Sequence, residues 1–197
     1  MKEVIVAITG ASGAQYAIKL IQTLVDSACR VHLTISVAGA RVLKHEMGID
    51  MNLQDFSPAA LTCRTTTQIN YYPNDDISAP LASGTFPIDS MVIIPCSMST
   101  LAAVASGLGT NLILRAADVS LKENRKLVLV PRETPLGTIA LENMLRASRA
   151  GACVLPAMPA FYHGPKKIDD MVDFIVGKVL DQLGVQHKLF PRWGDNG

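Results

Sequence analysis

Short apolar runs alternate with longer amphipathic segments along the whole chain. Residues 4–8 are apolar throughout and rich in β-branched side chains, which is typical of a parallel strand buried on both faces. From Gln15 the apolar positions recur every two to four residues, which predicts a helix with one buried stripe. The other predicted strands are residues 31–35, 68–72, 90–95, 126–130 and 152–155, and the other predicted helices are residues 39–47, 58–61, 97–106, 111–124, 138–150 and 168–183. Pro95 lacks a backbone donor and is expected to end its strand.

This alternation predicts a parallel sheet with helices on both faces. The chain shows no internal repeat, low-complexity segment or linker, so its 197 residues are expected to form a single domain, residues 1–197. We predict an α/β fold of three layers, α-β-α, Rossmann-like and flavodoxin-like, around a six-stranded parallel sheet in the order 3-2-1-4-5-6. The first and fourth strands then flank the point where the winding reverses, which places the loops after them opposite each other.

The turn after the first strand, Thr9-Gly10-Ala11-Ser12-Gly13-Ala14, contains only small residues. Its backbone N–H groups can approach a ligand closely, and it opens a helix whose N-terminus favours an anion such as phosphate. Its glycines do not fit the G-x-G-x-x-G pattern, and the second strand ends without the carboxylate that binds the ribose of a dinucleotide. The turn therefore favours a phosphate-bearing mononucleotide over NAD, unless it is only a tight strand-to-helix connection.

Polar side chains also follow the fourth and fifth strands. The hydroxyls at residues 97–100 are either ordinary helix caps or a second ligand-binding loop. Arg132 and Glu133 lie between prolines at the sheet edge where α/β folds bind ligands, and a surface ion pair is the alternative. Glu46 lies near the C-terminal end of its helix, where a carboxylate is poorly matched to the helix dipole. It therefore has either a specific role or a solvated surface position.

Charge and cysteine content narrow the classes of function. Lys and Arg number 18 against 17 Asp and Glu, so no global field attracts nucleic acid or an anionic membrane. No apolar run approaches the length needed to span a bilayer. The cysteines are Cys29, Cys63, Cys96 and Cys153. They form no C-x-x-C pair and have no histidine at zinc-ligand spacing, so no metal site is expected. Reduced cysteines and the lack of a signal-peptide pattern predict a cytoplasmic protein.

Several motifs, each weak alone, become specific through their order and spacing. They are Thr-Gly-Ala-Ser-Gly-Ala at 9–14, Pro-Cys-Ser-x-x-Thr at 95–100, Arg-Ala-Ala-Asp-Val at 115–119, Leu-Lys-Glu at 121–123, Pro-Arg-Glu-x-Pro at 131–135, Glu-Asn-Met at 142–144, Pro-Ala-Phe-Tyr-His at 159–163 and Arg-Trp at 192–193. On these motifs the chain, from residue 4 to residue 193, resembles the UbiX type of flavin prenyltransferase, formerly described as a phenolic acid or polyprenyl-hydroxybenzoate carboxy-lyase.

The resemblance implies transfer of a dimethylallyl group from dimethylallyl monophosphate to N5 and C6 of reduced FMN. The prenylated FMN would then serve a separate UbiD-type decarboxylase. The positions that match FMN-binding residues of the family are Gly10, Ala11, Ser12, Ser36, Ser97, Met98, Ser99, Thr100 and Arg132. Those that match prenyl-phosphate-binding residues are Tyr162 and Lys178. Relatives often have Arg at position 178, and lysine keeps the charge but loses the bidentate fork.

The chemistry of the residues agrees with this implication. Two phosphorylated ligands require clustered cations in a nearly neutral protein. Four cations lie on or beside the expected edge: Arg115, Lys122, Arg132 and Lys178. Glu133 can relay a proton to or from the leaving phosphate, and Glu46 is a second acid-base candidate. Trp193 can shelter an allyl cation by cation–π contact across a subunit boundary, and Ser12 can face the reactive side of the flavin.

Three other functions compete with this hypothesis. Flavoproteins that decarboxylate peptidyl cysteine or phosphopantothenoylcysteine carry Pro-Ala-Ser-Ala-Asn-Thr and Pro-x-Met-Asn loops, and both of these asparagines are absent here. A flavin-carrier subunit would have no reason to keep Glu133, Tyr162 and a cation at 178. The third is direct decarboxylation of an aromatic acid by a flavin-binding enzyme. We expect a homo-oligomer with residues 186–197 at a subunit contact, and the resemblance implies a dodecamer.

Overall fold

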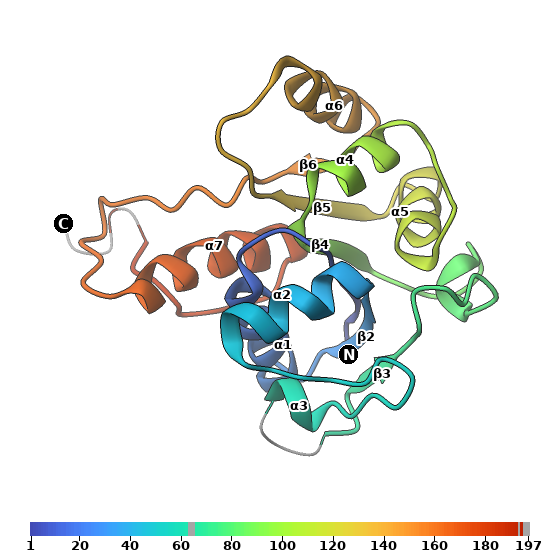
Figure 1. The fold of residues 1–197 in the computed structure, drawn as a ribbon. Coiled ribbons are helices and arrows are strands. Elements are labelled where there is room, and N and C mark those ends of the chain that lie inside the picture. The colour runs from blue at the N-terminus through green and yellow to red at the C-terminus, as the bar shows by residue number, and fades with distance from the viewer. Residues whose placement is uncertain (63–65, 193, 195–197) are drawn as a thin grey trace.

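The computed structural model describes residues 1–62, 66–192 and 194 (Figure 1). Within these residues one parallel sheet has the strand order β3-β2-β1-β4-β5-β6, which confirms the predicted order. The strands are β1 (Glu3–Ile8), β2 (Arg30–Ile35), β3 (Ile69–Tyr71), β4 (Ser90–Cys96), β5 (Lys126–Pro131) and β6 (Cys153–Val154). The winding reverses between β1 and β4, so the loops that follow these two strands lie next to each other at the carboxyl edge.

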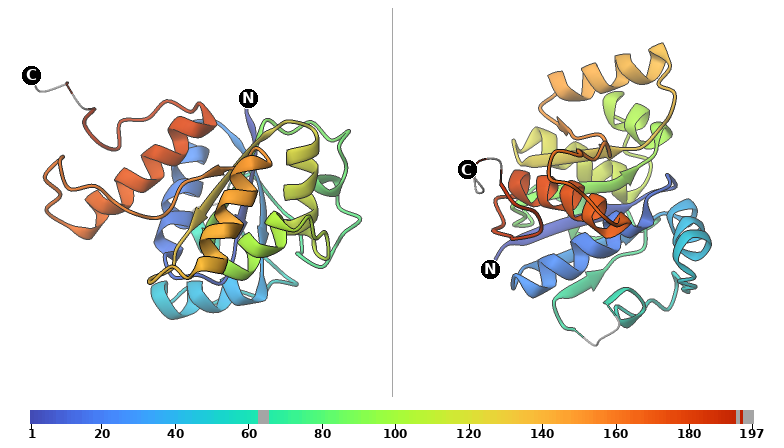
Figure 2. Two further views of the ribbon diagram at one scale, coloured as in Figure 1. Left: turned by 90° about the horizontal axis from the view of Figure 1, so that it is seen from above. Right: turned by 90° about the vertical axis from the view of Figure 1, so that its left-hand side faces the viewer.

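Helices cover both faces of the sheet, so the three predicted layers are present (Figure 2). One face carries α1 (Ala14–Asp26) and α7 (Ile168–Leu183), with α2 (Val37–Met47) and the short α3 (Ala59–Thr62) packed beside α1. The opposite face carries α4 (Met98–Ala105), α5 (Leu112–Lys122) and α6 (Thr138–Arg149). A 3-10 turn, η1 (Pro80–Ala82), packs against α5.

The alternation of side chains along β1 explains why two cores form. Val4, Val6 and Ile8 belong to the cluster under α1 and α7, whereas Ile5 and Ala7 belong to the cluster under α4 and α5. All five side chains are 2% exposed or less. A strand that is apolar at every position therefore lies at the centre of the sheet, because both of its faces are covered.

Two boundaries differ from the predictions for identifiable reasons. The expectation that Pro95 ends its strand is wrong, because β4 continues to Cys96, which pairs with Pro131 after a register shift beyond Ile93. The helix predicted from residue 39 begins at Val37. The side chain of Ser36 caps it by accepting a hydrogen bond from the Gly39 N–H at 3.0 Å.

α6 is the most exposed helix of the sheet's covering layers. Ile139, Leu141 and Leu145 are 76%, 51% and 50% exposed, and only Ala147 on this helix is buried. α7 and the extended chain before it project beyond the sheet, as Figures 1 and 2 both show. In the described part of the chain, no helix combines the length and apolarity needed to cross a membrane.

Candidate functional site

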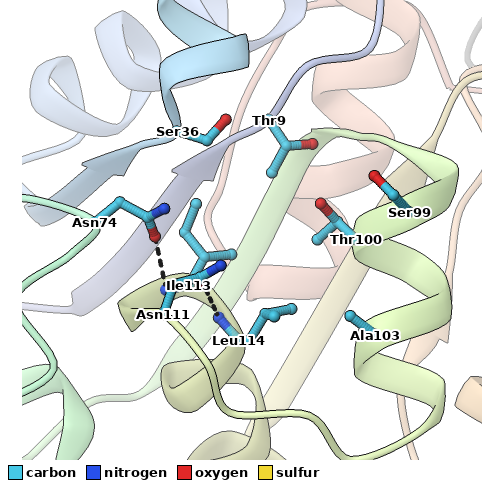
Figure 3. A pocket seen from close by; sticks show the side chains of 9 residues that line it. All are labelled: Thr9, Ser36, Asn74, Ser99, Thr100, Ala103, Asn111, Ile113 and Leu114. Atoms are coloured by element: carbon cyan, nitrogen blue, oxygen red, sulfur yellow. Dashed lines mark hydrogen bonds between the residues drawn. The ribbon is translucent and has the colours of Figure 1, made fainter.

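A cavity of about 230 Å³ opens at the point where the winding reverses (Figure 3). We call it the switch-point cavity. Its lining comes from the ends of β1, β2 and β3 and from α4 and α5, and consists of Thr9, Ser36, Asn74, Ser99, Thr100, Ala103, Asn111, Ile113 and Leu114. Hydroxyl and amide side chains from both halves of the sheet therefore face one space. Ser36, Ser99 and Thr100, predicted from separate loops, are brought together here.

Thr9 joins the two loops at the reversal point. Its Oγ1 donates a hydrogen bond to the carbonyl oxygen of Pro95 at 2.8 Å and accepts one from the Ser97 N–H at 2.8 Å. Ser97 then caps α4, and its Oγ lies 2.9 Å from Oγ1 of Thr100 and 3.1 Å from Oγ of Ser99. Ser97 is thus the helix cap, whereas Ser99 and Thr100 form part of the cavity wall. The cap is confirmed, and a ligand-binding role of this loop stays a prediction. An N-terminus surrounded by hydroxyl donors suits a phosphate.

Two asparagines in this wall were not predicted from the sequence. Asn111 caps α5 by accepting a hydrogen bond from the Leu114 N–H at 3.0 Å. Asn74 accepts one from the Ile113 N–H at 3.1 Å through its Oδ1. Asn111, placed before an amphipathic run, carries a readable cap signal. Asn74 lies in a loop without periodicity, and only the tertiary fold brings it to the N-terminus of α5.

A second cavity of about 490 Å³ lies on the other side of the β1–α1 turn. We call it the Arg132 cavity. It is lined by Ser12, Gly13, Gln15, Tyr16, His45, Glu46, Met47, Arg132 and Ala157. Nε of Arg132 donates a hydrogen bond to the carbonyl oxygen of Ser12 at 3.4 Å. Three predicted site residues that are far apart in the sequence, Ser12, Glu46 and Arg132, therefore share one wall.

Glu46 occupies the N-terminus of α1. Its carboxylate accepts hydrogen bonds from the N–H groups of Gly13 and Ala14, each at 2.9 Å. Burial alone would raise the pKa of Glu46, but hydrogen bonds from Ser12 and from these two N–H groups, together with the charge of Arg132, lower it below its ordinary value. This helix N-terminus, where the sequence predicts the phosphate of a ligand, binds a carboxylate of the chain itself. Glu46 is poorly matched to the dipole of its own helix, α2, because its carboxylate instead caps the N-terminus of α1.

Glycine is required where the β1–α1 turn meets α2. A Cβ at Gly10 would lie 2.5 Å from Cβ of Ala38, and a Cβ at Gly39 would lie 2.6 Å from the carbonyl oxygen of Ile8. Such distances are too short for carbon atoms in contact. The absence of these side chains lets α2 begin directly beside the end of β1, so that Ser36 reaches the switch-point cavity. Ala11 of the same turn is buried and lines neither cavity.

The other predicted site residues that the structure describes do not line these two cavities. Nε of Arg115 donates a hydrogen bond to the carbonyl oxygen of Ala82 at 3.2 Å, and the guanidinium pairs with Asp118 at 2.7 Å. Lys122 pairs with Glu123 at 3.6 Å; it ends α5 just before β5 begins, so it does not lie at the carboxyl edge, where it was expected. Glu133 is exposed and accepts a hydrogen bond from the N–H of Thr134 at 3.1 Å. The remaining four are Met98, which begins α4 and is partly buried, Tyr162 and Lys178, which lie on the projecting C-terminal part, and Trp193, which lies outside the described residues.

Comparison with known proteins gives full-length matches. A family model described as Flavoprotein matches residues 1–180. The chain is 50% identical to "Flavin prenyltransferase UbiX" of Halalkalibacterium halodurans over 190 residues, 96% of this chain and 92% of that protein. A crystal structure of AnUbiX (PadA1) in complex with FMN and dimethylallyl pyrophosphate superposes with a TM-score of 0.88 at 40% identity, covering 98% and 97% of the two chains. A dodecameric FMN-dependent UbiX-like decarboxylase from Escherichia coli O157:H7 gives 0.86 at 42% identity, covering 97% and 98%.

Proposed function

The chain belongs to the UbiX family of flavin prenyltransferases, and we propose that it transfers the dimethylallyl group of dimethylallyl monophosphate to N5 and C6 of reduced FMN. The observation that carries the proposal is the pair of cavities on the two sides of the β1–α1 turn, with Thr9 in one and Ser12 in the other. One offers hydroxyls and amides around a helix N-terminus, and the other offers a guanidinium and a carboxylate. Two phosphorylated molecules that react with each other need such adjoining sites.

The residues of the two cavities suit a flavin mononucleotide. Bound reduced FMN supplies the electron-rich ring atoms that are alkylated. Ser36, Ser99 and Thr100 would hold its phosphate in the switch-point cavity, where they converge beside the N-terminus of α4. Gly10 allows the close backbone approach, and Arg132 with Ser12 would orient the ring from the second cavity. Met98 and Ser97 would fix the loop that carries the phosphate ligands.

The departing phosphate needs a proton and positive charge. When the allylic C–O bond breaks, its electron pair stays on the phosphate oxygen, and Glu133 would donate a proton to that oxygen. Tyr162 and Lys178 would bind the phosphate, and Arg115 and Lys122 would add charge. Glu46, held as an anion on α1, would stabilise the allyl cation rather than donate a proton, because its pKa is lowered. Trp193 would shelter the same cation.

Those of these residues that the structure describes lie on separate elements of one chain, which supports a site completed by assembly. We propose a homo-oligomer, a dodecamer as named for the Escherichia coli relative, in which the apolar face of α6 is buried between subunits. The whole chain would act as one domain, with residues 186–197 reaching a neighbouring subunit. Leu141 and Leu145 are four residues apart, so these two exposed side chains lie on the same face of α6 and form the apolar face that we expect a neighbouring subunit to cover.

The test is anaerobic incubation of the protein with reduced FMN and dimethylallyl monophosphate, followed by the mass of the released flavin. The expected result is a flavin heavier by one prenyl group, and an unchanged mass with FMN bound would refute the proposal. Glu133→Gln is expected to keep FMN binding and to slow turnover by about 10²–10⁴, the range typical for the loss of a general acid. Exposed Asp55, which lines neither cavity, gives the control, since Asp55→Asn should keep the wild-type rate.

One alternative has a specific observation in its favour. The Escherichia coli relative is named a decarboxylase, so direct decarboxylation of an aromatic acid by the FMN-loaded protein, or a flavin-carrier role in a decarboxylase complex, is the second candidate. Release of CO₂ from an aromatic acid by FMN-loaded protein, without prenyl donor, would favour this function. Under the prenyltransferase proposal, CO₂ release requires an added UbiD-type decarboxylase together with the prenylated product.

We also propose that the protein acts in the cytoplasm, where its product reaches the decarboxylase. The cysteines described as free, Cys29, Cys96 and Cys153, suit a reducing compartment. Burial raises the pKa of the Cys96 thiol to about 12, which keeps it protonated and inert. Cell fractionation with detection of the protein in the soluble cytoplasmic fraction tests this location, and recovery from a membrane or exported fraction would refute it.

A further inference from the structure

The chain that follows α7 folds back along that helix. The side chains of His187 and Phe190 are 1% and 9% exposed, because they pack against the helix at Gly177. A Cβ at Gly177 would overlap the ring of Phe190 and would lie 2.6 Å from Cε1 of His187. The missing side chain at this position therefore makes room for the tail, and the tail returns Arg192 to the helix one turn beyond Gly177.

Arg192 meets Asp181 on α7. Its two terminal nitrogens donate hydrogen bonds to the two carboxylate oxygens of Asp181, at 2.7 and 2.8 Å. Nε2 of His187 lies 3.2 Å from the same carboxylate, and Nζ of Lys178 lies 4.0 Å from it. The hydrogen bond from Arg192 holds the pKa of Asp181 below its ordinary value. Asp181 is thus an anion that Arg192, His187 and Lys178 surround.

Tyr162 is connected to the same helix through aromatic contacts. Its ring packs edge-on against Phe174 at 5.9 Å between centroids, and Phe174 contacts Phe190 of the tail at 5.1 Å. Phe174 and Lys178 are four residues apart, so they lie on the same face of α7. One face of α7 therefore fixes the relative positions of Tyr162, Lys178 and the end of the tail. Asp181 is the carboxylate that Lys178 and Arg192 of the tail share.

We infer that Asp181 is a positioning residue, which orients the Lys178 ammonium toward the phosphate of the prenyl donor and fixes the tail through Arg192. This inference rests on the proposed function. A lysine ammonium on a flexible four-carbon stem loses rotamer entropy when it binds, and it lacks the preorganised fork of arginine. A fixed carboxylate beside it restricts that freedom before the phosphate arrives.

A carboxylate near a phosphate site would by itself repel the substrate. Here Arg192 offsets the charge of Asp181, so the group formed by Lys178, Asp181 and Arg192 keeps one net positive charge. The bidentate contact also holds the carboxylate oxygens in fixed directions. Asp181 therefore acts through Lys178 and the tail, without touching the substrate itself.

The test compares two aspartates of α7. Asp181 and Asp173 have side chains 22% and 20% exposed, and Asp173 pairs with Lys19 of α1 at 2.8 Å. Calorimetry with FMN-loaded protein measures the dissociation constant of dimethylallyl monophosphate, and oxidised FMN prevents turnover. We expect Asp181→Asn to weaken donor binding about tenfold, the loss of one charge-assisted contact. Asp173→Asn should leave donor affinity unchanged, although it should lower Tm about as much as Asp181→Asn does.

Steady-state assays separate positioning from a general structural defect. Asp181→Asn should raise KM for the donor about tenfold and change kcat less than about threefold, with FMN affinity unchanged. Asp181→Glu should restore part of the donor affinity. Equal donor affinity in Asp181→Asn and Asp173→Asn would overturn the inference. A loss of FMN affinity in Asp181→Asn as large as its loss of donor affinity would overturn it too.

The wild-type protein distinguishes this inference from the proposed function. If wild type binds the donor tightly but leaves the flavin mass unchanged, the proposed transfer fails while the comparison of the two aspartates still decides the role of Asp181. If wild type transfers the prenyl group and both asparagine variants bind the donor as wild type does, the inference alone fails. Wild type that does not bind the donor overturns both.

Discussion

Replacing Glu46 by glutamine is expected to destabilise the protein at neutral pH and to have little effect in acid. In wild type the carboxylate accepts hydrogen bonds from the N–H groups of Gly13 and Ala14 at 2.9 Å, at the N-terminus of α1. Glutamine keeps one acceptor oxygen and removes the charge. The change therefore isolates the interaction of a negative charge with the helix dipole and with Arg132.

The size of the expected loss in the free energy of unfolding follows from the exposed position of Glu46. A charge at a helix N-terminus contributes about 0.3–1 kcal/mol at exposed sites, and solvent screens the exposed side chain of Glu46. We therefore expect a loss of about 0.5–1 kcal/mol in the free energy of unfolding. For a chain of this size that is a decrease in Tm of about 1–4 °C.

The stability that Glu46 contributes should decrease as the pH falls. The pKa of Glu46 is lower in the folded protein than its ordinary value, so its contribution is present above the unfolded pKa, about 4.3, and is lost as pH falls through the folded pKa. Urea unfolding of wild type, Glu46→Gln and Asp55→Asn at several pH values measures this. The loss of stability in Glu46→Gln should be largest at pH 7 and should shrink in acid, while replacement of exposed Asp55 should cause none. A difference that is absent at pH 7, or constant with pH, would refute the reasoning.

Two further perturbations test the fold around the site and the assembly. Gly39→Ala is expected to cost about 1–3 kcal/mol and to weaken FMN binding, because the new methyl group would meet the carbonyl oxygen of Ile8; Gly137→Ala, which meets open space, is the control in thermal unfolding and flavin titration. Wild-type stability and FMN affinity in Gly39→Ala would contradict this. Leu141→Asp on α6 should lower the mass in size-exclusion light scattering without loss of helix content, whereas Ile77→Asp, at another exposed apolar position, should not. An unchanged mass for Leu141→Asp would show that α6 is not a subunit contact.

Much of the fold follows from local pattern, because periodicity and turn chemistry act within a few residues. α7 was predicted at 168–183 and is found at Ile168–Leu183, and the strand predicted at 4–8 corresponds to β1 (Glu3–Ile8). The motifs placed Ser36, the hydroxyls at 97–100 and Arg132 at the carboxyl edge of the sheet. For all of these the decisive information is contained in the spacing of apolar residues and in the residues that follow each strand.

Other features depend on contacts between distant segments. The sequence marks Glu46 as badly placed on its own helix, but only the packing of α2 beside α1 shows that Gly13 and Ala14 bind its carboxylate. Asn74 likewise reaches α5 only after the chain has folded. The residues after 183 have no regular period, yet Phe190 and Arg192 bind α7 at Gly177 and Asp181. The sequence by itself thus determined the elements, their order and the residues of the carboxyl edge. The tertiary structure decided which charges meet, because electrostatic partners and close approaches depend on distance in space, whereas periodicity depends on distance along the chain.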